Sequence, residues 1–158
     1  MKQYENRIVI ITRETRLSQV LETQNTMSQA RFYLNRLGAD FGEYEAEHTR
    51  YKDAVRETRR NLDELSTVQI LERKYLSNFI FAPSDIVVVI GQDGLVVNTL
   101  KYLDTQAVIG VNPDPSRWDG VLLPFTTADA ATIAEETITG KRKFRDVTMA
   151  KARVQNGQ

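Results

Sequence analysis

The 158-residue chain contains no cysteine, so disulfides, thiolate zinc sites and cysteine nucleophiles are all excluded. It has one histidine, His48, which rules out a multi-histidine metal site and argues against a serine–histidine triad. No apolar run approaches the roughly 18 residues of a membrane span, and the first residues do not resemble a signal peptide. These absences predict a cytoplasmic protein with no membrane partner.

Net charge is also lacking, because 21 lysines and arginines balance 21 aspartates and glutamates. Proteins that bind nucleic acid or anionic membrane surfaces usually present a net basic face, so we expect no nucleic-acid partner. The hydrophobic fraction of 41% and the charged fraction of 27% are ordinary for a globular domain. A chain of this length can bury a real core as one domain.

Four apolar segments predict strands, at residues 8–11, 67–71, 86–90 and 107–111. The first and third are continuous β-branched runs, which suit strands buried on both faces. Helical spacing of apolar residues falls between the strands and after the last one, over 17–37, 42–65, 95–103 and 127–138. This alternation predicts a three-layer, Rossmann-like α/β domain with a mostly parallel sheet flanked by helices.

Three residues or groups have a plain structural interpretation. His48 lies on the apolar stripe of the helix predicted over 42–65, so we interpret it as a partly buried structural histidine. Trp118 could be a ligand platform or could pack over its loop, and both interpretations stay open. The basic residues at 141–145 are interpreted as an interdomain or solvated surface, with phosphate binding as the alternative.

The segment Gly91-Gln92-Asp93-Gly94 directly follows the predicted strand at 86–90. Open α/β sheets bind ligands at the carboxyl ends of their strands. Glycines there allow a tight turn and close approach to a phosphate, and the next helix presents its N-terminal amides to the anion. Asp93 could accept a proton from a substrate hydroxyl or help to hold Mg²⁺. The same four residues are also a common turn sequence, so a purely structural role remains open.

A second polar loop follows the predicted strand at 107–111. It begins with Asn112-Pro113-Asp114-Pro115 and reaches Gly120. Parallel strands place their carboxyl ends at one edge of the sheet, so this loop and Asp93 are expected at the same edge.

Taken together, the two loops resemble those of the NAD kinase family, within the diacylglycerol-kinase-like superfamily. The family has a strand, Gly-Gly-Asp-Gly, a helix, and then a strand that ends in Gly-Val/Ile-Asn. The second loop here is similar to a branch with Gly-Val-Asn-x-Asp-Pro and a glycine five residues after the proline. Thr12 and Arg13 lie where the family has a polar loop after its first strand.

The resemblance implies transfer of a phosphoryl group from ATP or polyphosphate, with Mg²⁺, to the 2′-hydroxyl of the NAD adenosine ribose. Asp93 would be the base. The residues implied to contact phosphates or nucleotide are Thr12, Arg13, Gly91, Gln92, Gly94, Asn112 and Asp114. Gln92 and Leu95 depart from the usual glycine and threonine, which leaves an alternative: a nucleotide-binding or regulatory module of the same fold without turnover.

The resemblance also predicts the domain layout. Residues 1–143 would form the N-terminal nucleotide-binding domain, and 144–158 the first strand of a truncated C-terminal β-rich domain. Residues 146–154 predict that strand, and Asn156-Gly157 predicts a hairpin turn after it. We expect this chain alone to be inactive and a full-length parent to be a homo-oligomer. A receiver-like signalling domain is disfavoured, because Thr12-Arg13 offers no acids after the first strand.

Overall fold

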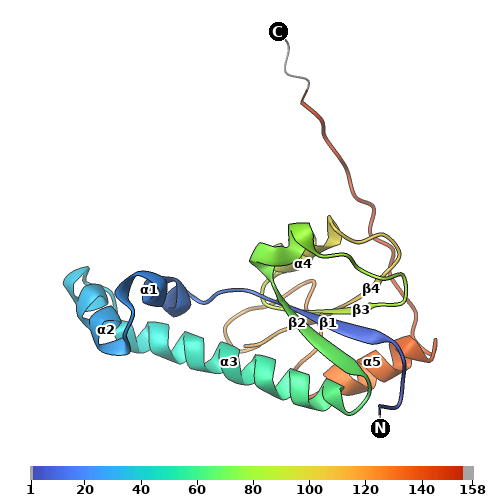
Figure 1. Cartoon of the computed structure of the whole chain (residues 1–158), viewed down its shortest axis with the longest axis horizontal. Coiled ribbons are helices and arrows are strands. Elements are labelled where there is room, and N and C mark those ends of the chain that lie inside the picture. The colour runs from blue at the N-terminus through green and yellow to red at the C-terminus, as the bar shows by residue number, and fades with distance from the viewer. Residues whose placement is uncertain (1, 155–158) are drawn as a thin grey trace.

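In the computed structural model, which describes residues 2–154, four parallel strands form one sheet flanked by helices (Figure 1). The strands lie in the order β2-β1-β3-β4 and comprise β1 (Arg7–Thr12), β2 (Thr67–Glu72), β3 (Ile86–Ile90) and β4 (Ala107–Val111). The helices are α1 (Arg16–Gln24), α2 (Met27–Arg36), α3 (Phe41–Asp63), the 3-10 helix η1 (Arg73–Asn78), α4 (Asp93–Leu100) and α5 (Ala130–Ile138). The predicted α/β class and parallel sheet are confirmed.

The central strands β1 and β3 are buried on both faces, as their β-branched sequences predict. On one face, Ile10 and Val88 pack in a cluster with Leu62 of α3 and Ile133 of α5. On the other face, residues such as Val89 pack in a cluster with side chains of η1 and α4. Each such side chain contributes about 1.5–3 kcal/mol when fully buried, so the sheet is a rigid base for the loops at its edges.

The helix predicted over 17–37 is in fact two helices, so that prediction is wrong in detail. Asn25 has a positive φ of 64° and ends α1. Thr26 then starts α2, because its side-chain oxygen accepts a hydrogen bond from the N–H of Gln29 at 3.1 Å. A threonine N-cap of this kind favours a new helix start over continuation.

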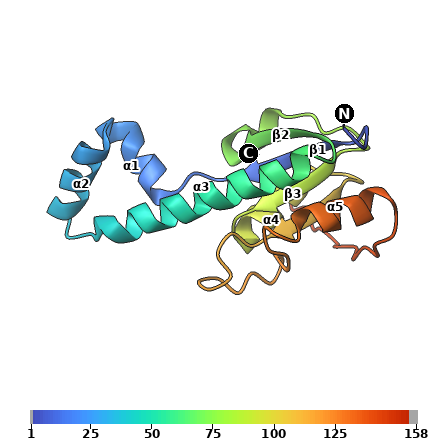
Figure 2. The ribbon, with the colours of Figure 1, turned by 90° about the horizontal axis from the view of Figure 1, so that it is seen from below.

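Helices α1 and α2 and the first half of α3 form an arm that extends away from the sheet (Figure 2). The arm has a small core of its own, made of Leu17, Ala30, Leu34 and Phe41. The second half of α3 packs on the sheet, so α3 carries side chains from the arm to the sheet edge. Within residues 2–154, none of the helices combines the length and the apolar character that crossing a membrane requires.

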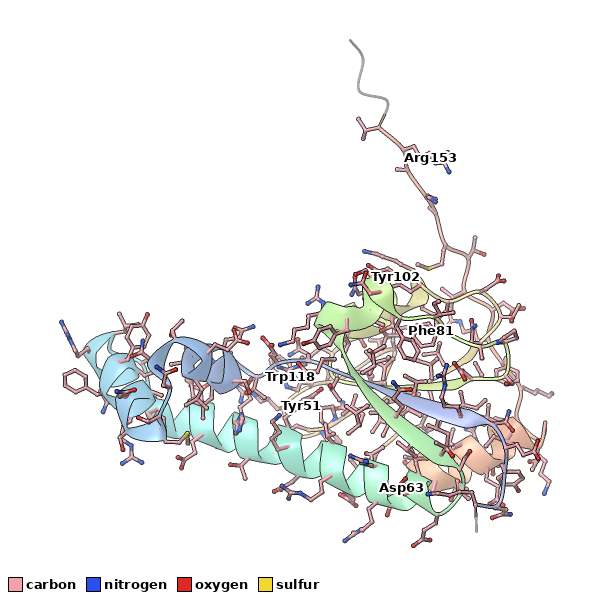
Figure 3. All side chains as sticks on the ribbon, in the orientation of Figure 1. Tyr51, Asp63, Phe81, Tyr102, Trp118 and Arg153 are labelled. Atoms are coloured by element: carbon pink, nitrogen blue, oxygen red, sulfur yellow. The ribbon has the colours of Figure 1, made fainter. Side chains whose placement is uncertain are left out.

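The strand predicted over 146–154 is not formed. Residues 143–154 carry no regular secondary structure and extend away from the body, with Arg153 near the end of the described part (Figures 1 and 3). A strand needs a neighbour for its backbone hydrogen bonds, and no described residue pairs with this segment. The predicted Asn156-Gly157 turn lies outside the described residues, so the domain layout stays a prediction.

Candidate functional site

The order of the strands places a switch point between β1 and β3. From β1 the chain crosses to β2 on one side, and then returns to β3 on the other side. Ligands of open α/β sheets bind outside the carboxyl ends of the strands at such a point. Thr12 ends β1 and Arg13 follows it, whereas Gly91 and Gln92 follow β3.

The turn after β3 leads directly into α4, which begins at Asp93. Gln92 is the N-cap, with extended backbone and no capping hydrogen bond from its side chain. Since the first amides of a helix have no partner within it, α4 presents the N–H groups of Asp93 and Gly94 outward. A Cβ on Gly94 would meet nothing within 4 Å, so packing does not require this glycine and the space beside it is open.

The carboxylate of Asp93 is bonded to the loop that follows β4. It accepts hydrogen bonds from the N–H of Leu122 at 2.9 Å and from the N–H of Val121 at 3.2 Å. These bonds join the start of α4 to a segment almost thirty residues further along. A carboxylate has about four acceptor positions, so Asp93 keeps capacity for another partner.

The same loop explains Gly110 in β4. A Cβ at this position would lie 2.0 Å from the carbonyl oxygen of Leu122, which no side chain could tolerate. The segment after Leu122 then runs beside β4, where the N–H of Asn112 bonds to the carbonyl of Phe125 at 2.7 Å. Two motif residues from different loops therefore both contact the Leu122 backbone: Asp93 at its N–H and Gly110 at its carbonyl.

Asn112 is buried and bonded within its own loop. Its Nδ2 donates to the carbonyl of Trp118 at 2.8 Å, and its Oδ1 accepts from the N–H of Asp114 at 3.0 Å. Gly120 has a φ of 59°, and a Cβ there would lie 2.8 Å from that Nδ2. The side-chain amide of Asn112 therefore bonds to the backbone at two points of the loop from 112 to 120 and holds the loop in place.

Asp114 is anchored to α3. Its carboxylate accepts from Ser116 Oγ at 2.6 Å and pairs with Arg50 at 2.8 Å, and these two contacts hold the pKa of Asp114 below its usual range. Arg117 reaches Glu43 of the same helix at 2.9 Å. Trp118 is 38% exposed with the Arg117 guanidinium 5.3 Å from its ring centre, an arrangement that fits either interpretation of this side chain.

Arg13 directly follows β1 and packs on α3. Its guanidinium carbon lies 4.8 Å from the centre of the Tyr51 ring, and its Nη1 lies 3.8 Å from Glu47. Its Nε is buried and has no hydrogen-bond partner in the described structure. Thr12, just before it, is buried at the last position of β1. The predicted site residues therefore all lie at the carboxyl edge, but on two sides of it.

Beside Arg13 the edge contains a cavity of about 320 Å³ that the sequence did not predict. Its lining residues come from the segment after β1, the end of β2, η1, α1 and α4: Arg13, Glu14, Gln19, Glu72, Arg73, Lys74 and Asn98. Lys74 pairs with Glu14 at 2.8 Å, which raises its pKa. The charged run Glu72-Arg73-Lys74 at a strand end was the available sequence signal.

His48 occupies a structural position, as expected. Its Nδ1 lies 2.7 Å from the hydroxyl of Thr15, the N-cap of α1, and 3.4 Å from that of Ser18. Burial, followed by the positive charge of Lys52, lowers the pKa of His48. The hydrogen bonds of His48 therefore support the junction between β1 and α1, and they do not involve Asp93.

The two candidate carboxylates do not fit a metal ion held by the protein itself. Asp93 is bonded to two backbone N–H groups and Asp114 to Arg50 and Ser116. Within residues 2–154, no three histidine, cysteine, aspartate or glutamate residues gather as a metal site would require. Mg²⁺ commonly binds through substrate phosphates and only one or two carboxylates, so such an ion would have to come with its nucleotide.

Comparison of the sequence with protein-family models and with curated proteins finds no match.

Proposed function

We propose that this chain is the nucleotide-binding domain of an NAD kinase-like phosphotransferase, with a three-layer Rossmann-like arrangement. The observation that carries the proposal is the bonding of Asp93 to the amides of Val121 and Leu122. These bonds bring together the two loops on which the family resemblance rests. They do so at the carboxyl edge, where folds of this class bind ligands.

The phosphates would bind at the start of α4. The outward amides of Asp93 and Gly94, together with the positive end of the helix dipole, favour an anion there. Gln92 is exposed and its side-chain amide can donate to a phosphate oxygen. Arg13, across the switch point, adds a positive charge on the β1 side. ATP or polyphosphate is the proposed donor, and Mg²⁺ would accompany its phosphates.

Asp93 would then act as the base for the acceptor, NAD. The 2′-hydroxyl oxygen of the adenosine ribose attacks the terminal phosphorus of the donor, and its proton passes to Asp93. ADP, or polyphosphate shortened by one unit, is the leaving group. Positioning supplies most of the rate in such a transfer. The resemblance implies further acceptor contacts from a β-rich domain, so we propose weak binding and no turnover for this chain alone.

A second candidate is a nucleotide-binding or regulatory module of the same fold without turnover. It is favoured by the fact that Asp93, Asn112 and Asp114 are all bonded to protein groups. If these bonds persist when nucleotide binds, the three side chains act as structural supports and the α4 amides remain the phosphate site.

Titration calorimetry of the full chain with ATP, tripolyphosphate and NAD, each with Mg²⁺, tests the shared part of both proposals. We expect millimolar binding of ATP and tripolyphosphate, weakened at least fivefold by Gln92→Glu, because the new carboxylate repels phosphate. Gln29→Glu is the matched control, since Gln29 is exposed in the first turn of α2, another helix start. Equal loss in both variants, or no binding by the wild type, would contradict the site.

An NADP assay on a parent chain that includes the β-rich domain separates the two candidates. NADP formed with ATP or polyphosphate supports the phosphotransferase. Binding without NADP under either donor supports the module.

A further inference from the structure

The carboxyl ends of β1 and β3 separate at the switch point. Backbone pairing between these strands ends at Ile11 and Val89, whereas β3 continues to pair with β4 as far as Ile90 and Val111. The last peptide groups of β1 and β3 thus face one another without a direct hydrogen bond in the strand ladder. A buried gap between two strand ends needs another polar group to satisfy them.

The hydroxyl of Tyr51 lies in this gap. Tyr51 is a buried residue of α3 (Figure 3), and its hydroxyl donates to the carbonyl of Ile90 at 2.7 Å. The same oxygen accepts a hydrogen bond from the N–H of Arg13 at 2.9 Å. One side chain thereby connects the two strand ends beyond the point where their own pairing stops.

Each bond fixes a whole peptide plane. The carbonyl of Ile90 and the N–H of Gly91 belong to one planar peptide group, so the first bond also sets the direction of the Gly91 N–H. In the same way, the bond to the Arg13 N–H sets the direction of the Thr12 carbonyl. These two planes begin the turn into α4 and the loop after β1. Tyr51 therefore bonds to the backbone at both strand ends.

We infer that Tyr51 is a positioning residue for the phosphate site, bridging the ends of β1 and β3 and orienting the backbone that leads into α4. The identity of the bound group rests on the proposed function. The orientation of the backbone by Tyr51 does not, and the two can be tested separately.

The test compares Tyr51→Phe with wild type, and uses Tyr44→Phe as control. Tyr44 lies on the same helix, and its ring packs beneath the Arg16 guanidinium at 4.3 Å. For each full chain, tripolyphosphate affinity is measured by calorimetry, and amide hydrogen exchange is measured by NMR. We expect Tyr51→Phe to weaken binding at least tenfold and Tyr44→Phe less than twofold. Exchange at Arg13, whose N–H bonds to the Tyr51 hydroxyl, should rise at least tenfold in Tyr51→Phe. The amide signals of Gly91–Gly94 should shift, with central β3 residues unchanged.

The outcomes separate the two ideas. If the wild type binds but Tyr51→Phe retains affinity within twofold, the positioning role is overturned. If the wild type binds none of the phosphate probes, the proposed function fails, and the NMR measurements alone decide the role of Tyr51. Unchanged exchange at Arg13 and unshifted amide signals at Gly91–Gly94 would then overturn it, and local changes at these residues would support it.

Replacement of Tyr51 by 3,5-difluorotyrosine covers the case in which Tyr51→Phe does not fold. The pKa of the native phenol is raised to about 12, chiefly by burial. Arg13 opposes this rise, and the charge of Glu72 adds to it. The fluorinated phenol ionises at much lower pH and then cannot donate to Ile90. We expect its phosphate affinity to fall at least fivefold as it ionises, while wild type stays constant over the same range. Parallel pH profiles would overturn the inference.

Discussion

The two sides of the carboxyl edge are built in different ways. On the β4 side, Asp93 and Asn112 bond to the backbone of the loop that follows β4, and Gly110 packs against that backbone. Gly120 packs against the Asn112 side chain. On the β1 side, charged residues line a cavity and His48 supports the adjoining helix cap. The glycine and asparagine motifs thus mark the side that backbone contacts close, whereas the side with open volume is lined by charged residues that form ion pairs.

The largest effect is expected at the centre of the β4 side. Gly110→Ala places a Cβ 2.0 Å from the Leu122 carbonyl oxygen, so backbone must move. We expect unfolding free energy to fall by about 3 kcal/mol. Gly94→Ala is the matched control, because its Cβ meets nothing within 4 Å, and it should be neutral or stabilising by about 0.5 kcal/mol. Urea unfolding measures both. Similar values for the two variants would show that Leu122 is not seated against Gly110.

Asp93→Asn gives the next largest effect. Its amide can still accept one backbone hydrogen bond, but its NH₂ faces the second N–H, from Val121 or Leu122. Leaving that donor unsatisfied costs about 1–2 kcal/mol of stability. Asp119→Asn, at an exposed position in the same loop, should change stability by less than about 0.5 kcal/mol. Equal unfolding midpoints for Asp93→Asn and wild type would show that the two backbone bonds contribute nothing.

The structural role of Asp93 complicates a test of its role as a base. An assay of Asp93→Asn alone cannot separate loss of a proton acceptor from loss of loop structure. The NADP rate of the variant, measured in a parent chain that includes the β-rich domain, therefore needs comparison with hydrogen exchange at Val121 and Leu122. A lost rate with unchanged exchange identifies the base.

Sequence patterns predicted the parts of the fold that depend on local or periodic features. The β-branched runs gave β1 and β3, and alternation with helices gave the parallel sheet. The strand over 146–154 was wrong because alternation alone cannot supply a pairing partner. The break between α1 and α2 was missed, although Asn25 and the Thr26 cap were visible in the sequence.

For the candidate site, the sequence correctly indicated which edge of the sheet the motif residues share. It could not show what they bond to. The partners of Asp93 lie 28 and 29 residues away, at positions with no distinctive side chain, because the donors are backbone amides. The bonds of Tyr51 could not be predicted for a similar reason, because its spacing on α3 is that of an ordinary core residue.

The smallest effect is a pH response confined to the β1 side. The pKa of folded His48 is lowered from its unfolded value of about 6.5, chiefly by burial. The folded state therefore binds fewer protons than the unfolded state below that pH. The stability contributed by burying neutral His48 is fully present above about pH 6.5, and it is lost as the pH falls through the folded pKa of His48. His48→Asn keeps an acceptor near the Thr15 hydroxyl and should remove this loss between pH 7 and pH 5. Since the chain has one histidine, its imidazole NMR signal reports the pKa directly. A pKa at or above 6.5, or identical stability profiles for the two chains, would contradict the burial of this ring against α1.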